Sequence, residues 1–383
     1  MAAPVFVAWR DLRFAKGRFA LMGAVIVLIT VLVGLLSGLT AGLGRENTSA
    51  ITALPADHLV FSAPAGDGGV KFTDSRLPER TVREWARVPG VRSAEPLGIA
   101  TTKAEAGTAE PGTATAGSSE AGKAGPGGRT AAVSVFGVRP GSRLGPASGQ
   151  VADGSVVLSE KAASSLGVRA GDALTLGGRA LRVTAVSGPA MYSHTPVVWT
   201  SLGDWQRLTP GPGPAVGATV VALSTTASAG LPTADERLGT RTVSTDDALN
   251  AIGSYAAEHG SLQLMRGFLF AISALVIGAF FTVWTIQRGG DIAVLKALGA
   301  STRYLLRDAL GQAVALLVIG TGLGTAVVAA VGAGIGGTVP FVLDPTTVLL
   351  PSLIMIALGA VGAALAIRRI TSVDPLTALG SAR

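Results

Sequence analysis

The stretch Thr285-Ile-Gln-Arg-Gly-Gly-Asp-Ile-Ala-Val-Leu-Lys-Ala-Leu-Gly-Ala-Ser-Thr302 lies between two long apolar segments and is too polar to stay inside a bilayer. In a helix, several of its apolar side chains form one short face while the charged side chains remain in water. That face consists of Ile292, Val294, Leu295 and Leu298, and the charged residues include Asp291 and Lys296. The pattern predicts a helix that lies on a membrane surface or docks on a partner protein.

The composition is that of a membrane protein. Hydrophobic residues make up 48% of the 383 residues and charged residues only 14%, a combination that is rare in a soluble domain of this length. A helix needs about 20 apolar residues to cross the hydrocarbon core. Four segments meet this requirement and are predicted to be transmembrane helices: residues 19–43, 263–286, 305–335 and 348–367.

Lys and Arg residues determine the predicted orientation, because cationic residues near span ends are retained in the cytoplasm. They gather in residues 1–18, 287–304 and 368–383, which are therefore predicted to be the cytoplasmic N-terminal segment, coupling loop and tail. Residues 44–262 and 336–347 then lie outside, so the chain is predicted to be a multi-pass plasma-membrane protein with a large extracellular domain. The first span is too long for the apolar region of a cleaved signal peptide. This topology also explains the net charge of +7, and no nucleic-acid partner is expected.

The external domain is predicted to be α+β. Strands are expected at residues 57–61, 131–138, 155–159, 173–176 and 180–186, and short helices at 78–87 and 160–166. The alternation of strand, helix and turn from residue 149 to 187 predicts a small lobe similar to a β-barrel. Residues 103–129 are almost entirely small or polar and are predicted to be a disordered surface loop. The sequence has no cysteine, so the domain must be stabilised by its core and not by disulfides.

No motif for catalysis stands out. The sequence lacks the Gly-x-x-x-x-Gly-Lys-Ser/Thr loop that binds nucleotide phosphates, so the chain is not expected to be an enzyme and ATP hydrolysis is expected in a separate subunit. The histidines, His58, His194 and His259, are scattered, and no metal site is predicted.

Small residues recur in two of the spans. In the first span, Gly34, Gly38 and Gly42 are four residues apart, a spacing that allows close helix packing and here predicts a homodimer. The third span is also rich in glycine, which we interpret as a site of helix packing rather than a substrate path.

The coupling segment, the external lobe and the C-terminal residues 368–379 together resemble the FtsX/MacB-type ABC transporter permeases. Further patches resemble the haem-exporting permeases of Gram-positive bacteria: residues 6–19, 36–43, 192–198, 280–288 and 294–299. The resemblance covers most of the chain except the loop at 103–129. It implies a membrane α-helical fold with four transmembrane helices and an α+β extracytoplasmic domain.

The same resemblance implies a function and a partner. A separate cytoplasmic ABC ATPase would press on the coupling segment, whose candidate contact residues are Asp291, Ile292, Val294, Leu295, Lys296 and Leu298. The cargo would be haem, as a transported substrate and not as a cofactor. Candidate haem-binding residues near the outer ends of the first two spans, or in the external domain, are Glu46, Tyr192, His194, Tyr255 and Met265.

Two other functions remain open on the sequence. The chain could be an FtsX-like signalling module that activates a cell-wall hydrolase, or an exporter of lipids, peptides or lipoproteins. The candidate donors also have structural interpretations, because a tyrosine at a span end commonly anchors the helix in the interface and a histidine beside a proline can shape a turn.

Overall fold

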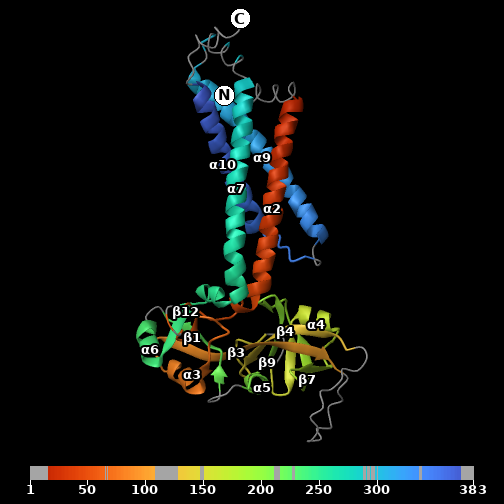
Figure 1. Cartoon of the computed structure of the whole chain (residues 1–383), viewed down its shortest axis with the longest axis vertical. Helices are drawn as coiled ribbons and strands as arrows, with labels where there is room; N and C mark the ends of the chain where they lie inside the picture. The colour runs from red at the N-terminus through yellow and green to blue at the C-terminus, as the bar shows by residue number, and fades with distance from the viewer. Residues whose placement is uncertain are drawn as a thin grey trace. The chain divides into compact units, whose positions relative to one another are not determined.

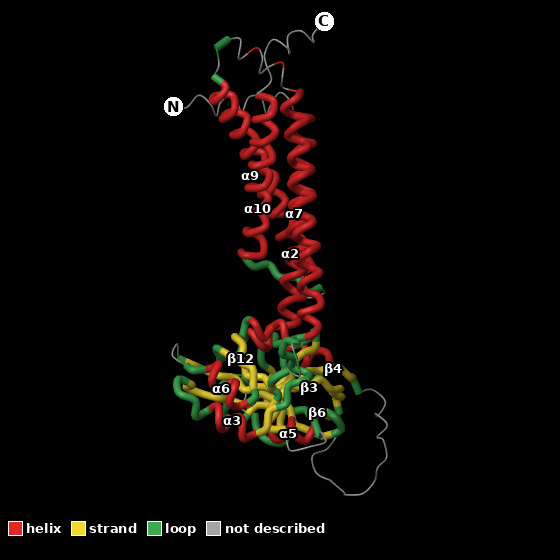
Figure 2. Tube along the Cα trace, turned by 60° about the vertical axis from the view of Figure 1, so that its left-hand side comes forward, coloured by secondary structure: helices red, strands yellow, loops and turns green. Residues whose placement is uncertain are grey.

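The computed structural model describes residues 16–64, 66, 68–107, 128–146, 151–210, 216–226, 229–287, 290, 294, 298–299, 301–335 and 339–371. The chain divides into two compact units. Met1–Leu43 and Gly260–Arg383 form a helical unit, and Gly44–His259 form a mixed α/β unit. Figures 1 and 2 show that the strands belong to the second unit.

Within the described residues, four helices are long and apolar enough to cross a membrane. They are α2 (Lys16–Thr52), α7 (Gly253–Gln287), α9 (Thr302–Ile335) and α10 (Pro345–Thr371). Each contains one of the predicted spans, but α2 and α7 are considerably longer than the apolar segments and carry polar residues into the second unit. The bundle core joins side chains of all four helices, among them Met22, Ile277, Leu317 and Met355.

Glycines allow α2 and α9 to approach closely. A Cβ atom on Gly320 would lie 2.8 Å from Ile26, and one on Gly324 would lie 2.7 Å from Thr30. The predicted interpretation of glycines in the third span as packing positions therefore holds for these two residues. Gly322, on the same helix, has no neighbouring atom within 4 Å.

The glycines of the first span have a different role from the predicted one. A Cβ atom on Gly34 would lie 2.7 Å from Val328, and one on Gly42 would lie 1.8 Å from the carbonyl oxygen of Pro340. The ring of Phe341 occupies the space beside Gly38. This motif is filled within the chain, so it cannot be the argument for a homodimer.

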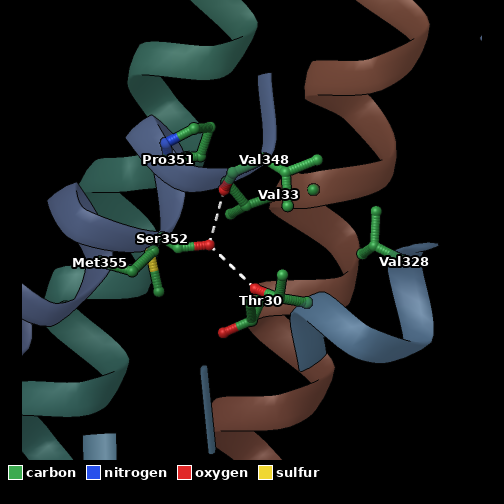
Figure 3. A pocket seen from close by; sticks show the side chains of 9 residues that line it. Thr30, Val33, Val328, Val348, Pro351, Ser352 and Met355 are labelled. Carbon is green, nitrogen blue, oxygen red and sulfur yellow. Dashed lines mark hydrogen bonds between the residues drawn. The ribbon is translucent and has the colours of Figure 1, made fainter. Parts of the chain in front are cut away.

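Hydroxyl groups meet inside the bundle around a small pocket of about 10 Å³ (Figure 3). The hydroxyls of Thr325 and Ser352 are 3.0 Å apart, and Ser352 also donates to the carbonyl oxygen of Val348 at 2.7 Å. Thr30 donates to the carbonyl oxygen of Ile26. These bonds satisfy polar groups that water cannot reach in a bilayer. Pro351 lines the same pocket and removes one backbone donor from α10.

The second unit is built on one large sheet. Its strands are β1 (His58–Ser62), β3 (Val91–Ala106), β4 (Thr130–Val138), β5 (Ser155–Leu158), β6 (Ala173–Leu176), β7 (Arg179–Val186), β8 (Met191–Tyr192), β9 (Thr195–Ser201), β11 (Val220–Thr225) and β12 (Thr240–Ser244). A separate pair consists of β2 (Leu77–Pro78) and β10 (Val216–Ala218). The helices are α3 (Glu79–Trp85), α4 (Glu160–Leu166), α5 (Leu202–Leu208), α6 (Leu231–Leu238) and the 3-10 helix η1 (Asp247–Ala251).

The strand β3 belongs to two lobes. Its first half pairs with β11, up to Leu97, and its second half pairs with β4 from Gly98 onwards. The order β3-β4-β9-β5-β7-β6 then closes on itself, because β6 also pairs with the end of β3. The predicted lobe similar to a barrel is therefore present, and buried aliphatic side chains such as Leu158 and Leu174 form its core.

Trp205 of α5 packs where β3 passes from one lobe to the other. Gly98 and Gly137 are cross-strand partners, and a Cβ atom on either would lie within 2.4 Å of Trp205. Because neither glycine has a side chain, the buried indole ring of Trp205 can pack directly on the backbone of β3 and β4 at this point.

Most of the locally predicted elements of this unit are confirmed, including α4 and β6 with the expected bounds. The predicted loop at 103–129 is wrong at its start, because residues 103–106 continue β3. Pairing with β4 and β6 holds this small, polar segment in the sheet. Residues 108–127 lie outside the described residues.

Gly324→Ala is expected to lower the free energy of unfolding by about 1–3 kcal/mol, because a well-packed interface must move to admit a methyl group. Gly322→Ala is the matched control on the same helix, since open space surrounds that position. Thermal unfolding of the detergent-solubilised protein measures the difference. Equal transition temperatures for the two variants would show that α2 and α9 do not pack through Gly324.

Candidate functional site

The polar end of α2 is bound by the tip of the hairpin formed by β8 and β9. The backbone N–H groups of Ser193 and His194 donate to the carbonyl oxygens of Asn47 and Glu46 at 3.0 and 3.1 Å. Ser49 bonds both backbone groups of Met191, accepting from its N–H at 2.9 Å and donating to its carbonyl oxygen at 3.2 Å. The hairpin tip is therefore attached to one side of the helix.

The beginning of α7 completes this cluster, which we call the helix junction: Glu46, Asn47, Ser193, His194, Ser254 and Glu258. Both carboxylate oxygens of Glu258 lie 3.0 Å from Nε2 of His194. The amide nitrogen of Asn47 donates to Glu258 at 3.0 Å and lies 2.8 Å from the same imidazole nitrogen. Ser254 donates to the amide oxygen of Asn47, whose side chain is only 1% exposed.

Glu46 lies on the other side of the imidazole. One of its oxygens pairs with Lys161 of α4, and the other is 3.8 Å from Nδ1 of His194. Two carboxylates thus flank the two ring nitrogens of one histidine.

The backbone at the hairpin tip is strained. Ser193 and His194 have φ values of 48° and 61°, and no other described non-glycine residue has a positive φ. A two-residue hairpin turn with positive φ at both positions normally contains Asn and Gly. Such strain persists only where surrounding contacts enforce it, and it often marks a functional position. The contacts here are the hydrogen bonds to α2 and α7.

The structure separates Tyr192 from the other predicted cargo donors. Its side chain is 6% exposed and packs edge-on against Phe72 and Phe136, with ring centroids 5.7 and 5.6 Å apart. Burial raises the pKa of the Tyr192 phenol. Its backbone lies in the same hairpin as His194, but its ring belongs to the core of the domain.

Tyr255 and Met265 both lie on α7. Tyr255 is next to Ser254 of the junction, is partly buried and stacks on His259 with ring centroids 4.7 Å apart. Its hydroxyl makes no hydrogen bond to a described residue. Met265 is 53% exposed and belongs to the helical unit. The structure therefore brings Glu46 and His194 together, with Tyr255 on the helix that supplies Glu258.

Four residues of this region did not stand out in the sequence: Asn47, Lys161, Ser254 and Glu258. The available signal was the position of polar residues just beyond the ends of two apolar spans, where a transmembrane helix leaves the bilayer. Their pairing could not be read from the chain, since the partners are more than 100 residues apart.

The predicted coupling segment is described only in part. Val294 and Leu298 are 60% and 79% exposed, and the N–H of Leu298 donates to the carbonyl oxygen of Val294 at 3.0 Å. One turn of helix thus presents both side chains on one face. Asp291, Ile292, Leu295 and Lys296 lie outside the described residues.

The junction can supply carboxylate and imidazole donors, and Tyr255 beside it can supply a phenol. Among the described residues, no three His, Cys, Asp or Glu side chains converge in a way that could hold a bare metal ion.

Family comparisons cover both units. The model described as "MacB-like periplasmic core domain" matches residues 19–240, and "FtsX-like permease C-terminal" matches residues 264–375. The chain belongs to the FtsX/MacB-type ABC transporter permeases. The permease is therefore a plasma-membrane protein with an extracytoplasmic α+β domain, and its family implies an ATPase partner.

Two relatives align over nearly the whole permease. A Staphylococcus haemolyticus protein named as a hemin transport system permease, HrtB, is 26% identical over 98% of this chain and 99% of its own length. A Mycobacterium tuberculosis protein named only as an ABC transporter permease is also 26% identical, with the same coverage. The crystal structure of the periplasmic region of MacB from Actinobacillus actinomycetemcomitans matches with a TM-score of 0.35 and 11% identity, over 53% of this chain and 95% of that one.

Asn47→Ala should lower the free energy of unfolding by about 1–3 kcal/mol, because it removes a buried amide and leaves its partly buried partners, Ser254 and Glu258, without that hydrogen bond. Thr52→Ala is the control, since Thr52 is exposed and bonds only to carbonyls of its own helix. Thermal unfolding of both variants measures the effect. A transition temperature for Asn47→Ala equal to that of the control would mean that the junction does not hold the helices.

Proposed function

We propose that the permease uses a separate ATPase to export haem, and that it acts as a homodimer. The observation that carries the proposal is the set of hard and borderline donors at the helix junction, Glu46 and His194, with Tyr255 beside it. Histidine and tyrosine are established axial ligands of haem iron. The name of the staphylococcal relative supports the same cargo.

The donors differ in how readily they can bind iron. Both ring nitrogens of His194 face carboxylates, so this residue must leave Glu258 or Glu46 before it can act as a ligand. The hydroxyl of Tyr255 has no described hydrogen-bond partner to lose. Glu46 needs only to release Lys161 or share its second oxygen. Tyr255 and Glu46 are therefore the principal donors in this proposal, and Met265 is a softer alternative further along α7.

Tyr192 is left out of this donor set. Its ring packs against Phe72 and Phe136 in the core of the domain and is not part of the helix junction. The homodimer is proposed because four spans per chain are few for a transporter, and not because of the glycines on α2.

Movement of the coupling segment provides a mechanism. Closure of an ATPase pair would displace the exposed face of Val294 and Leu298 and, with it, the adjoining end of α7. Since α7 runs unbroken from Gly253 to Gln287, its displacement would move Glu258 against Asn47 and His194. The junction residues would then give up hydrogen bonds to one another and bind cargo, or release cargo and form those hydrogen bonds again.

Haem binding tests the cargo. Titration of the purified permease with haem is expected to give a Soret band that shifts in Tyr255→Phe and Glu46→Ala, because loss of an axial donor changes the ligand field of the iron. Affinity should fall about tenfold or more in each. Tyr304→Phe is the matched control for the phenol, since Tyr304 lies on α9 in the other unit. Exposed Glu79 of α3 provides the control Glu79→Ala.

Cells that lack the permease should also be more sensitive to haem. If haem binds neither the permease nor its complex with the ATPase, and deletion leaves haem tolerance unchanged, an exporter of lipids or peptides becomes the better proposal.

Leu298→Asp tests coupling. A charge on the apolar face should remove the contact with the ATPase and abolish the stimulation of ATP hydrolysis by the permease, while membrane insertion continues. Ser301→Asp is the control: it adds the same charge nearby, at a position where the side chain caps α9 and aspartate is well tolerated. ATP hydrolysis is measured in the reconstituted complex. Full stimulation in Leu298→Asp would remove this face from the mechanism.

A further inference from the structure

The extracytoplasmic domain contains a cleft of about 380 Å³ that is separate from the helix junction. It lies where β3 passes between the two lobes, beside α5. Its described lining includes Phe72, Arg76, Thr101, Tyr192 and Trp205. The volume falls within the usual range for sites that bind small molecules.

Aromatic rings dominate one part of this lining. Phe72 and Tyr192 pack edge-on at 5.7 Å and are nearly immobile because both are buried. Trp205 is held flat against Gly98 and Gly137. Rings that are fixed in this way favour an aromatic ligand, since little side-chain freedom is lost when it binds.

Two polar groups among the lining residues lack a partner in the part of the chain that the structure describes. The indole N–H of Trp205 is buried and has no partner among the described residues. No described residue bonds the hydroxyl of Tyr192. Such groups in a folded protein call for an explanation, and an absent ligand or water is one.

Arg76 adds a positive charge. Its Nη1 donates to the carbonyl oxygens of Thr73 and Ser75 at 3.2 and 3.0 Å, which fixes the guanidinium. No described carboxylate lies within ion-pair distance of Arg76. An oriented guanidinium is suited to a carboxylate ligand.

We infer that this cleft is a binding site for a small aromatic carboxylate, with its rings against Phe72, Tyr192 and Trp205 and its carboxylate on Arg76. The site is distinct from the cargo donors at the helix junction and does not depend on the identity of the cargo. Thr101, exposed on β3, lines the cleft and offers a position from which to block it.

The probe is 1-naphthaleneacetate, titrated calorimetrically into the full-length permease in lipid nanodiscs. Saturable binding is expected, and the neutral analogue 1-naphthaleneethanol should bind at least tenfold more weakly, because it cannot form the charge-assisted bond. Arg76→Gln should weaken the probe about tenfold or more, and Tyr192→Phe about fivefold. Thr101→Trp should abolish binding by filling the cleft.

Arg83→Gln is the matched control, since Arg83 is an exposed arginine of α3 that does not line the cleft. If Thr101→Trp does not fold, the affinity of Arg76→Gln for the probe tests the inference instead, because this variant changes only an exposed side chain. Absence of saturable binding to the unaltered permease would overturn the inference. So would equal affinities in Arg76→Gln and Arg83→Gln, or equal affinities for the acid and the alcohol.

Discussion

Asn47 is almost completely buried, and a buried amide must find partners for both its donor and its acceptor atoms. Its nitrogen bonds Glu258, its oxygen accepts from Ser254, and its backbone carbonyl accepts from the hairpin tip. Each partner comes from a segment far away in the sequence. Because loss of one bond leaves the others desolvated and incomplete, these contacts form and break together. The junction is therefore better regarded as one cooperative network than as a sum of independent contacts.

The hairpin that forms this junction is also part of the barrel. Met191 and Tyr192 pair with β9, and β9 in turn pairs with both β4 and β5. A displacement of His194 is therefore carried into the centre of the sheet, and not absorbed by a free loop. The other face of the same hairpin carries the ring of Tyr192 into the cleft. The helix junction and the cleft thus share one short piece of backbone.

The sequence predicted the elements whose signals are local. Each of the four spans is a long, predominantly apolar run, and α4 lies between a capping serine, Ser159, and Gly167, which adopts the left-handed conformation at its end. The long strand β3 was missed because its alanines and threonines have little intrinsic preference that distinguishes strand from loop. Its state is set by pairing with strands on both sides.

The candidate site was only partly predictable for a related reason. Glu46, His194 and Tyr255 could be selected by residue type and by distance from the span ends, but the bonds to Asn47 and Glu258 are long-range and leave no local pattern. The direction of the Tyr192 ring follows from strand alternation in a hairpin that was not predicted. The spacing of Gly34, Gly38 and Gly42 indicated a close neighbour, but a spacing alone cannot specify whether that neighbour belongs to the same chain.

The close packing of α2 and α9 has a consequence for how the helical unit can deform. Where Gly320 and Gly324 lie against Ile26 and Thr30, neither helix can slide or rotate without driving methyl groups into backbone atoms. The buried residues of α7 are all in its second half, from Ser273 to Thr285, whereas side chains from Leu264 to Ile272 are largely exposed. The α2–α9 pair is thus the stiff member of the bundle, whereas few side chains hold the first half of α7, so displacement of α7 is expected to meet the least resistance in that half.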